Sequence, residues 1–184
     1  MKPQSRGRRN ALPRTGSLCL GAGRGVDPEI FTGNALNAVD AKGRLSVPAF
    51  IRSTLERTSD ARIVSIGVHE SRPCLTVFGQ SHLEHMLREF DRRQLATEER
   101  GEDSDELDDR SAGVFGMIER VPYDGSGRII LPKLLRNEGR IDDLALFVSR
   151  ARFVELWNPR VALAEGGERL KRIAAYYLEQ RGAE

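Results

Sequence analysis

Apolar and polar residues alternate in the same order in two halves of the chain, which predicts the same series of strands and helices twice. In the first half, Pro48 suits a helix start because its missing N–H is not needed there. We expect a tight β-hairpin over 34–39 and 44–47, a helix over 49–57, and strands over 62–68 and 75–78. In the second half we expect strands over 114–121 and 128–131, a short helix from Pro132 closed by Gly139 as its C′ residue, and strands over 144–149 and 153–157.

An amphipathic helix is expected after each half. Leu83, Met86, Leu87 and Phe90 share one helical face, with Ser81 as the N-cap, and a last helix carries Leu170, Ile173, Ala174, Tyr177 and Leu178. The resulting domain assignment is a disordered basic N-terminal extension (1–30), a first repeat (31–80), a helix and acidic linker (81–112), a second repeat (113–159) and a C-terminal helix (160–184).

One nine-residue motif occurs in both halves. The stretch DAKGRLSVP, which starts at Asp40, returns eighty-four positions later as DGSGRIILP, which starts at Asp124. The arginine four residues after each motif proline, Arg52 or Arg136, is also shared. A half of about 50 residues buries little surface alone, so the two halves are expected to cover each other about a pseudo-twofold axis.

The residue types of the motif suit a rigid turn that carries a cation. Asp40 can accept N–H groups of the turn, Gly43 can adopt a positive φ, and Arg44 can face Asp40. The simplest interpretation is structural: an ion pair that fixes a hairpin. However, the first turn adds Lys42, and small residues surround Arg128 in the second, which favours contact with a phosphate or a nucleic-acid groove.

Charge is distributed unevenly although the net charge of the 184 residues is only +2. Residues 1–30 carry a net +4 and residues 98–110 a net −6, which leaves +4 for the rest of the chain. A mildly basic folded part permits binding to a polyanion. No apolar run is long enough for a membrane helix, and the two cysteines, Cys19 and Cys74, indicate no disulfide framework, which favours a reducing cytoplasm.

The segments FTGNALNAVDAKGRLSVP and YDGSGRIILP, the latter followed by FVELWNP, resemble the two repeats of the MraZ family of bacterial transcriptional regulators. The resemblance extends from Phe31 to the last helix. It implies an α+β fold in which two tandem swapped-hairpin repeats of the SpoVT/AbrB type form an intramolecular pseudo-twofold barrel, each repeat followed by a helix. Family members generally begin near the position of Phe31. Either the basic residues before it add non-specific attraction to DNA, or translation starts nearer Val26, and we favour the second interpretation.

The resemblance also implies a function. It implies a cytoplasmic, nucleoid-associated regulator that binds double-stranded DNA as a ring-like homo-oligomer, at repeated boxes upstream of its own gene in the division and cell-wall cluster. Arg44 would be the main DNA contact, Lys42 a supporting phosphate contact and Arg128 a second contact. The residues that would shape and orient the motif are Asp40, Gly43, Asp124 and Gly127. No cofactor, metal, membrane or small-molecule substrate is expected.

Two other functions stay open. For an enzyme, His82 and His85 lie three residues apart on an expected helix, but two ligands do not make a metal site and no catalytic motif accompanies them. For a structural or assembly protein, the same fold would serve without specific DNA binding, and Arg44 and Arg128 would be held in internal ion pairs.

Overall fold

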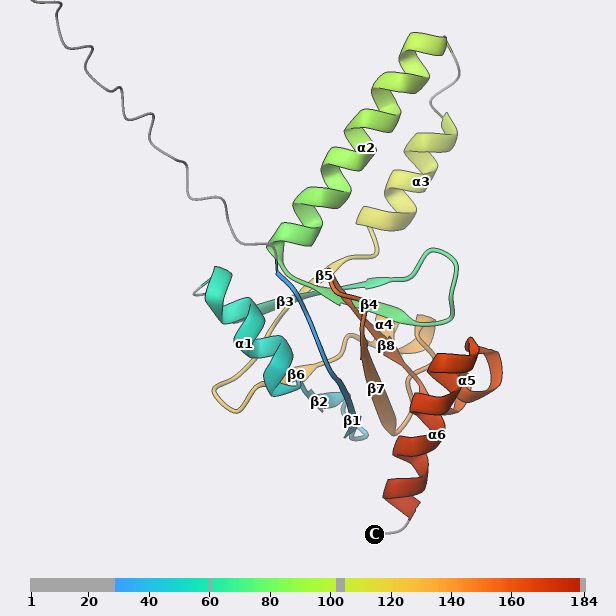
Figure 1. Cartoon of the computed structure of the whole chain (residues 1–184). Coiled ribbons are helices and arrows are strands. Elements are labelled where there is room, and N and C mark those ends of the chain that lie inside the picture. The colour runs from blue at the N-terminus through green and yellow to red at the C-terminus, as the bar shows by residue number, and fades with distance from the viewer. Residues whose placement is uncertain (1–28, 60, 102–104, 183–184) are drawn as a thin grey trace, which may run out of the picture.

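The computed structural model describes residues 29–59, 61–101 and 105–182, so Cys19 and most of the predicted N-terminal extension lie outside the described residues. The fold is α+β, as predicted (Figure 1). The strands are β1 (Asn34–Ala38), β2 (Arg44–Ser46), β3 (Ile63–Val68), β4 (Leu75–Phe78), β5 (Glu119–Pro122), β6 (Arg128–Ile130), β7 (Leu144–Ser149) and β8 (Val154–Trp157). The helices are α1 (Ala49–Thr58), α2 (Gln80–Arg100), α3 (Asp105–Phe115), α4 (Lys133–Glu138), α5 (Pro159–Glu165) and α6 (Glu168–Gly182).

Strands from the two halves interleave in one antiparallel sheet. In the described part of the chain its order is β1-β7-β8-β4-β3-β5, while β2 and β6 pair separately as a two-stranded ribbon, here called the β2–β6 ribbon. Each strand of the first half has a counterpart in the second: β1 and β5, β2 and β6, β3 and β7, β4 and β8. Exchanging every strand for its counterpart leaves the sheet order unchanged when it is followed from the other edge.

The predicted local hairpin over 34–39 and 44–47 is wrong in its pairing. The two segments share a single bridge, between Val39 and Leu45. All five residues of β1 pair instead with β7, and β2 pairs with β6. The turn between β1 and β2 therefore sends the chain out of the large sheet and into the ribbon, where strands of both halves complete each other.

The main hydrophobic core lies between one face of the sheet and a layer made of α1, α4 and the ribbon. Alternate strand residues point into it, as expected for strands that cover a core. The sheet contributes Val64, Ile66, Leu75, Val77, Ala145, Phe147, Val154 and Leu156, and the covering layer contributes Leu45, Ile51, Leu55, Ile129, Leu131 and Leu135. The ribbon is thus held by buried side chains on its inner face.

A second core lies on the opposite face of β7 and β8, under α5 and α6 (Figure 1). It contains Cys74, Leu146, Val148, Trp157, Ala162, Leu170 and Ala174. The segment expected as one C-terminal helix contains two, because Asn158 starts α5 by accepting the N–H of Arg160 at 2.9 Å, and Gly166 and Gly167 separate α5 from α6.

The helices α2 and α3 project from the sheet side by side as a helical hairpin (Figure 1). The rings of Phe90 and Phe115 meet edge to face at 5.7 Å between them. The predicted strand over 114–121 is therefore wrong in its first part: Val114 and Phe115 end α3, and β5 begins at Glu119. The polar composition of the acidic run concealed this helix, in which Leu107 is the one large apolar residue before Val114 and Phe115.

Two helix ends also differ from the prediction. Ser81 is not an N-cap, because α2 begins at Gln80; its hydroxyl donates to the carboxylate of Glu29 at 2.7 Å. Glu29 is buried, 3% exposed, and also accepts the Thr58 hydroxyl at 2.8 Å. After α4, Gly139 has a φ of −77°, and the residue in the left-handed region is Arg140.

Within the described segments, no helix combines the length and apolar character needed to cross a bilayer.

The buried Cys74 lies immediately before β4, and burial raises the pKa of its thiol to about 12. The thiolate is the reactive form of cysteine, so the folded chain protects this residue twice, by exclusion of reagent and by its pKa.

We expect Cys74 to be inert in the native protein. In a Cys19→Ser variant at pH 8, iodoacetamide should alkylate Cys74 on the order of a thousandfold more slowly than an ordinary exposed thiol, because so little thiolate forms. Mass spectrometry over time measures the rate, and the same variant in urea supplies the unprotected control. Equal rates in the two states would contradict the buried position.

Candidate nucleic-acid interface

The first motif forms a closed turn between β1 and β2 in which one carboxylate has three donors. Oδ1 of Asp40 accepts the backbone N–H groups of Lys42 at 2.9 Å and of Arg44 at 2.8 Å. Oδ2 of Asp40 accepts Nε of Arg44 at 2.5 Å. The aspartate therefore fixes the backbone of the turn and the direction of the arginine together.

The second motif repeats this arrangement between β5 and β6. Oδ1 of Asp124 accepts the N–H groups of Ser126 at 2.8 Å and of Arg128 at 3.0 Å, and Oδ2 accepts Nε of Arg128 at 3.0 Å. Here Nη2 of Arg128 also lies 2.9 Å from Oδ2. The shared Asp-x-x-x-Arg spacing thus has the same structural cause in both halves.

The motif glycines allow each turn to bind the other half of the chain. Gly43 and Gly127 both have a φ of +78°, a conformation that side-chain-bearing residues adopt at a cost. The carbonyl of Gly43 accepts the N–H of Leu131, and the carbonyl of Gly127 accepts the N–H of Val47, both at 2.8 Å. Each turn is therefore joined to the strand end that belongs to the other motif.

Pairing of the ribbon brings the two arginines onto one surface. Arg44 lies opposite Ile130 and Ser46 lies opposite Arg128, and these four side chains form what we call the outer face of the ribbon. Leu45 and Ile129, the central residues of the two strands, are buried in the core. Residues placed diagonally on such a ribbon are about 7–8 Å apart. Both arginine side chains are 56% exposed.

Two further arginines, whose role was missed in the sequence, support the turns from below. Nη1 of Arg136 lies 3.5 Å from the carbonyls of Asp40 and Ala41, and its Nη2 donates to the carbonyl of Asp142 at 2.8 Å. Arg52 lies under the second turn, where a Cβ on Gly127 would be 2.4 Å from its Nε. The signal was the shared position four residues after each motif proline.

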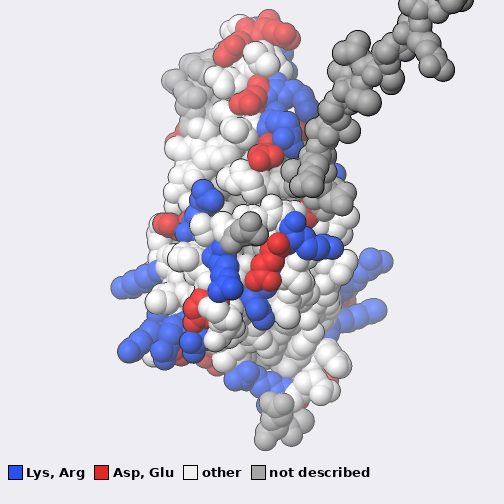
Figure 2. All heavy atoms as spheres, turned by 90° about the vertical axis from the view of Figure 1, so that its left-hand side faces the viewer, with Lys and Arg blue, Asp and Glu red and all other residues white. Residues whose placement is uncertain are grey.

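The turns hold their charges in ionised form. The backbone N–H of Arg44, followed by its guanidinium, lowers the pKa of Asp40, and the backbone N–H of Arg128 is likewise the main cause that lowers the pKa of Asp124. Each aspartate therefore offsets part of its arginine's charge, whereas Lys42 is exposed in the first turn and forms no ion pair with a carboxylate of the described residues. Lys and Arg side chains predominate over the lower, sheet-bearing half of the face in Figure 2, and acidic side chains gather at the top, where α2 ends.

The surface beside the ribbon is hollowed into a groove of about 480 Å³. Its lining residues are Arg44, Val121, Pro122, Tyr123, Asp124, Arg128, Ile129 and Ile130. Both arginines thus border one concavity that has an apolar floor.

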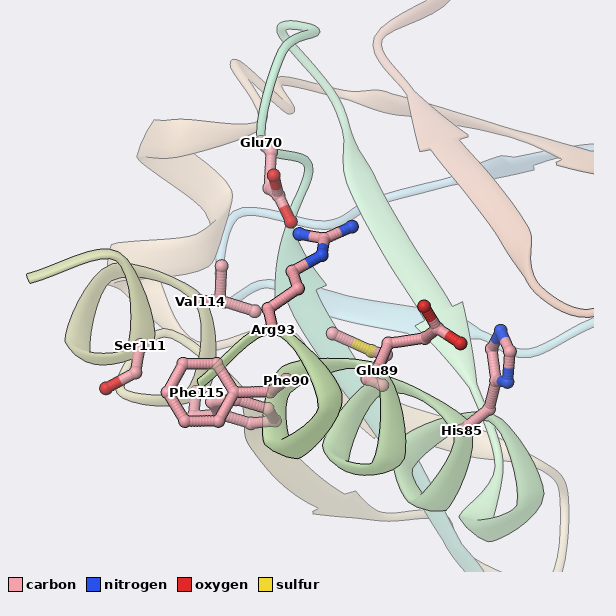
Figure 3. Close-up of a pocket in the computed structure, with 9 residues that line it drawn as sticks. Glu70, His85, Glu89, Phe90, Arg93, Ser111, Val114 and Phe115 are labelled. Atoms are coloured by element: carbon pink, nitrogen blue, oxygen red, sulfur yellow. The ribbon is translucent and has the colours of Figure 1, made fainter. Parts of the chain in front are cut away.

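A second pocket, of about 200 Å³, lies between α2, α3 and the loop after β3 (Figure 3). Arg93 and Glu70 point toward each other across it, and His85 lies at its far end (Figure 3).

His82 packs between the rings of Phe78 and Phe153, and burial lowers its pKa to about 4. Among the described residues, no group of three or more His, Cys, Asp or Glu side chains is arranged to hold a metal ion.

No family model matches the chain. The chain is 32% identical to the transcriptional regulator MraZ of Rickettsia peacockii over 131 residues, which cover 71% of this chain and 83% of that protein. It is 29% identical to the transcriptional regulator MraZ of Gluconacetobacter diazotrophicus over 155 residues, 83% of this chain and 94% of that protein. The chain belongs to the MraZ family. That family of transcriptional regulators is the one that the two motif segments resemble.

We expect Gly127 to be essential to the second turn, because a side chain there would be strained and would displace Arg52. Gly127→Ala should lower the free energy of unfolding by about 1–3 kcal/mol. Gly125→Ala is a matched control in the same turn, where the new methyl group would be 3.8 Å from the nearest side-chain atom, on Arg62. Urea unfolding followed by circular dichroism measures both, and equal losses would contradict the argument.

Proposed function

We propose that the chain is a sequence-specific DNA-binding transcriptional regulator that contacts double-stranded DNA with the outer face of the ribbon and its two turns. The observation that carries the proposal is the pair of aspartate-oriented arginines on one exposed surface. An arginine fork matches the O6 and N7 acceptors of guanine, and a two-stranded ribbon fits the major groove. Orientation by an aspartate lowers the conformational entropy that an arginine loses on binding.

The two motifs are unequal in our proposal. Arg44 is the main base contact, since its hydrogen bond to Asp40 uses Nε and leaves the terminal nitrogens for a base. Lys42 adds a phosphate contact beside it. Arg128 is a second contact whose Nη2 also lies against Asp124. Asp40, Asp124, Gly43 and Gly127 shape and orient the turns.

Interleaved strands, with counterparts paired in the ribbon and between β4 and β8, support two swapped-hairpin repeats of the AbrB type around a pseudo-twofold axis. We propose the repeats over 31–80 and 113–159, joined by the segment 81–112 and followed by 160–184.

We further propose that the chain acts as a ring-like homo-oligomer on repeated boxes upstream of its own gene, in the division and cell-wall cluster, in the cytoplasm and on the nucleoid. One protomer offers few cations, and each neutralised phosphate contributes a limited counterion-release free energy. Several ribbons held in one assembly would bind repeated boxes far more tightly than one box. A structural or assembly protein without specific DNA binding is the alternative.

Substitution of Arg44 tests the proposal. The Arg44→Ala variant should bind duplex DNA from upstream of its gene about 10–100-fold more weakly and lose its preference over a scrambled duplex, because a bidentate base contact is removed. Fluorescence anisotropy measures both affinities. Arg92→Ala is the control: Arg92 pairs with Glu89 on the projecting helix α2, away from the ribbon, and its loss removes the same charge. Wild-type protein that binds both duplexes equally weakly would favour the assembly alternative.

Box number tests the ring. A duplex with two boxes should bind at least tenfold more tightly than a duplex with one, since the second contact is made within an assembled complex. Light scattering of the free protein should give a mass well above a dimer. A monomer that binds one box as tightly as two would overturn the ring.

A further inference from the structure

The outer face of the ribbon carries one large apolar side chain. Ile130 is 64% exposed at the end of β6, opposite Arg44 on β2. Burial of such a side chain would favour folding, so the exposed Ile130 side chain contributes nothing to the core. Ile129, its neighbour along the strand, already fills the inward position, 3% exposed.

The two halves differ at this position although their turns are alike. Counted from the motif arginine, Ser46 of the first half corresponds to Ile130 of the second. The outer face is therefore asymmetric: Arg44 is paired with an apolar residue and Arg128 with a hydroxyl. The backbone of the ribbon accepts both residue types at the same register, so the difference lies in what each presents outward.

The major groove of DNA offers few apolar groups that Ile130 can contact. Nearly all groups that base pairs expose in the major groove are hydrogen-bond donors or acceptors, and the apolar exception is the 5-methyl group of thymine. Side chains opposite each other on a ribbon are about 4.5–5.5 Å apart at Cβ. Base pairs are stacked about 3.4 Å apart. Arg44 and Ile130 are thus spaced to contact neighbouring base pairs.

We propose that Ile130 is a specificity-determining residue that packs against the 5-methyl group of a thymine beside the guanine contacted by Arg44. The inference rests on the proposed function, since it needs the ribbon in the major groove. Ser46, at the equivalent place, can only exchange hydrogen bonds with a base there. The ribbon consequently distinguishes the two directions of its site although its backbone is nearly symmetric.

Single methyl groups test this contact. A tight-binding duplex is selected from a random pool, and each thymine is replaced in turn by deoxyuridine, which lacks only the methyl group. The wild-type protein should lose about threefold to tenfold in affinity at one position, next to a guanine. Ile130→Ser should lose a similar factor on the unmodified duplex and no more on the duplex with uracil at that position. Ser46→Ile is the matched variant, expected to keep the original methyl dependence.

The outcomes separate the two proposals. If selection yields no preferred duplex, the proposed function fails. If a preferred duplex exists but no uracil weakens binding, or Ile130→Ser keeps the same methyl dependence as the wild type, the thymine contact is overturned. If instead Ile130→Ser changes the mass measured by light scattering and leaves methyl dependence intact, Ile130 and the half-exposed Leu134 form a contact between copies, which also overturns it.

Discussion

The hydrogen bonds that join each motif turn to the other half of the chain are the constraint on which the rest of the structure depends. The carbonyl of Gly43 needs the N–H of Leu131, and the carbonyl of Gly127 needs the N–H of Val47. Backbone groups in a folded protein require partners, so neither turn is complete within its own half. The ribbon, its buried inner face and its exposed arginines all follow from this mutual pairing.

The two halves share the same strands and turns but differ in the helices and side chains that lie at the surface. After β8 the chain folds back as α5 and α6 and covers the second core, whereas after β4 it leaves the sheet as the α2–α3 hairpin. The turns differ likewise, with Lys42 in one and small residues in the other. The shared strands and turns therefore make the ribbon rigid. The differences between the halves make its two ends unequal toward any molecule that the ribbon binds.

Local features were predictable, while pairing between distant segments was not. Asp40 and Arg44 face each other because the residues of this short turn determine its conformation without help from the rest of the chain. The alternation in 34–39 and 44–47 is equally compatible with a local hairpin and with pairing to the second half, and only the core decides between them. The acidic residues before Val114 and Phe115 concealed α3, whose order depends on packing against α2. The support that Arg136 gives to the first turn joins residues 96 positions apart.

Interleaving also affects how the chain is made. During synthesis, β1 leaves the ribosome long before β7, and β4 before β8, so each waits for a partner about 80 to 110 residues further along. Unpaired strand edges are prone to pair with another chain. Two nascent chains of this protein could satisfy the same pairings by exchanging halves. Folding within a single chain therefore depends on the rate of synthesis and on the local concentration of nascent chains, as well as on the free energy of the folded monomer.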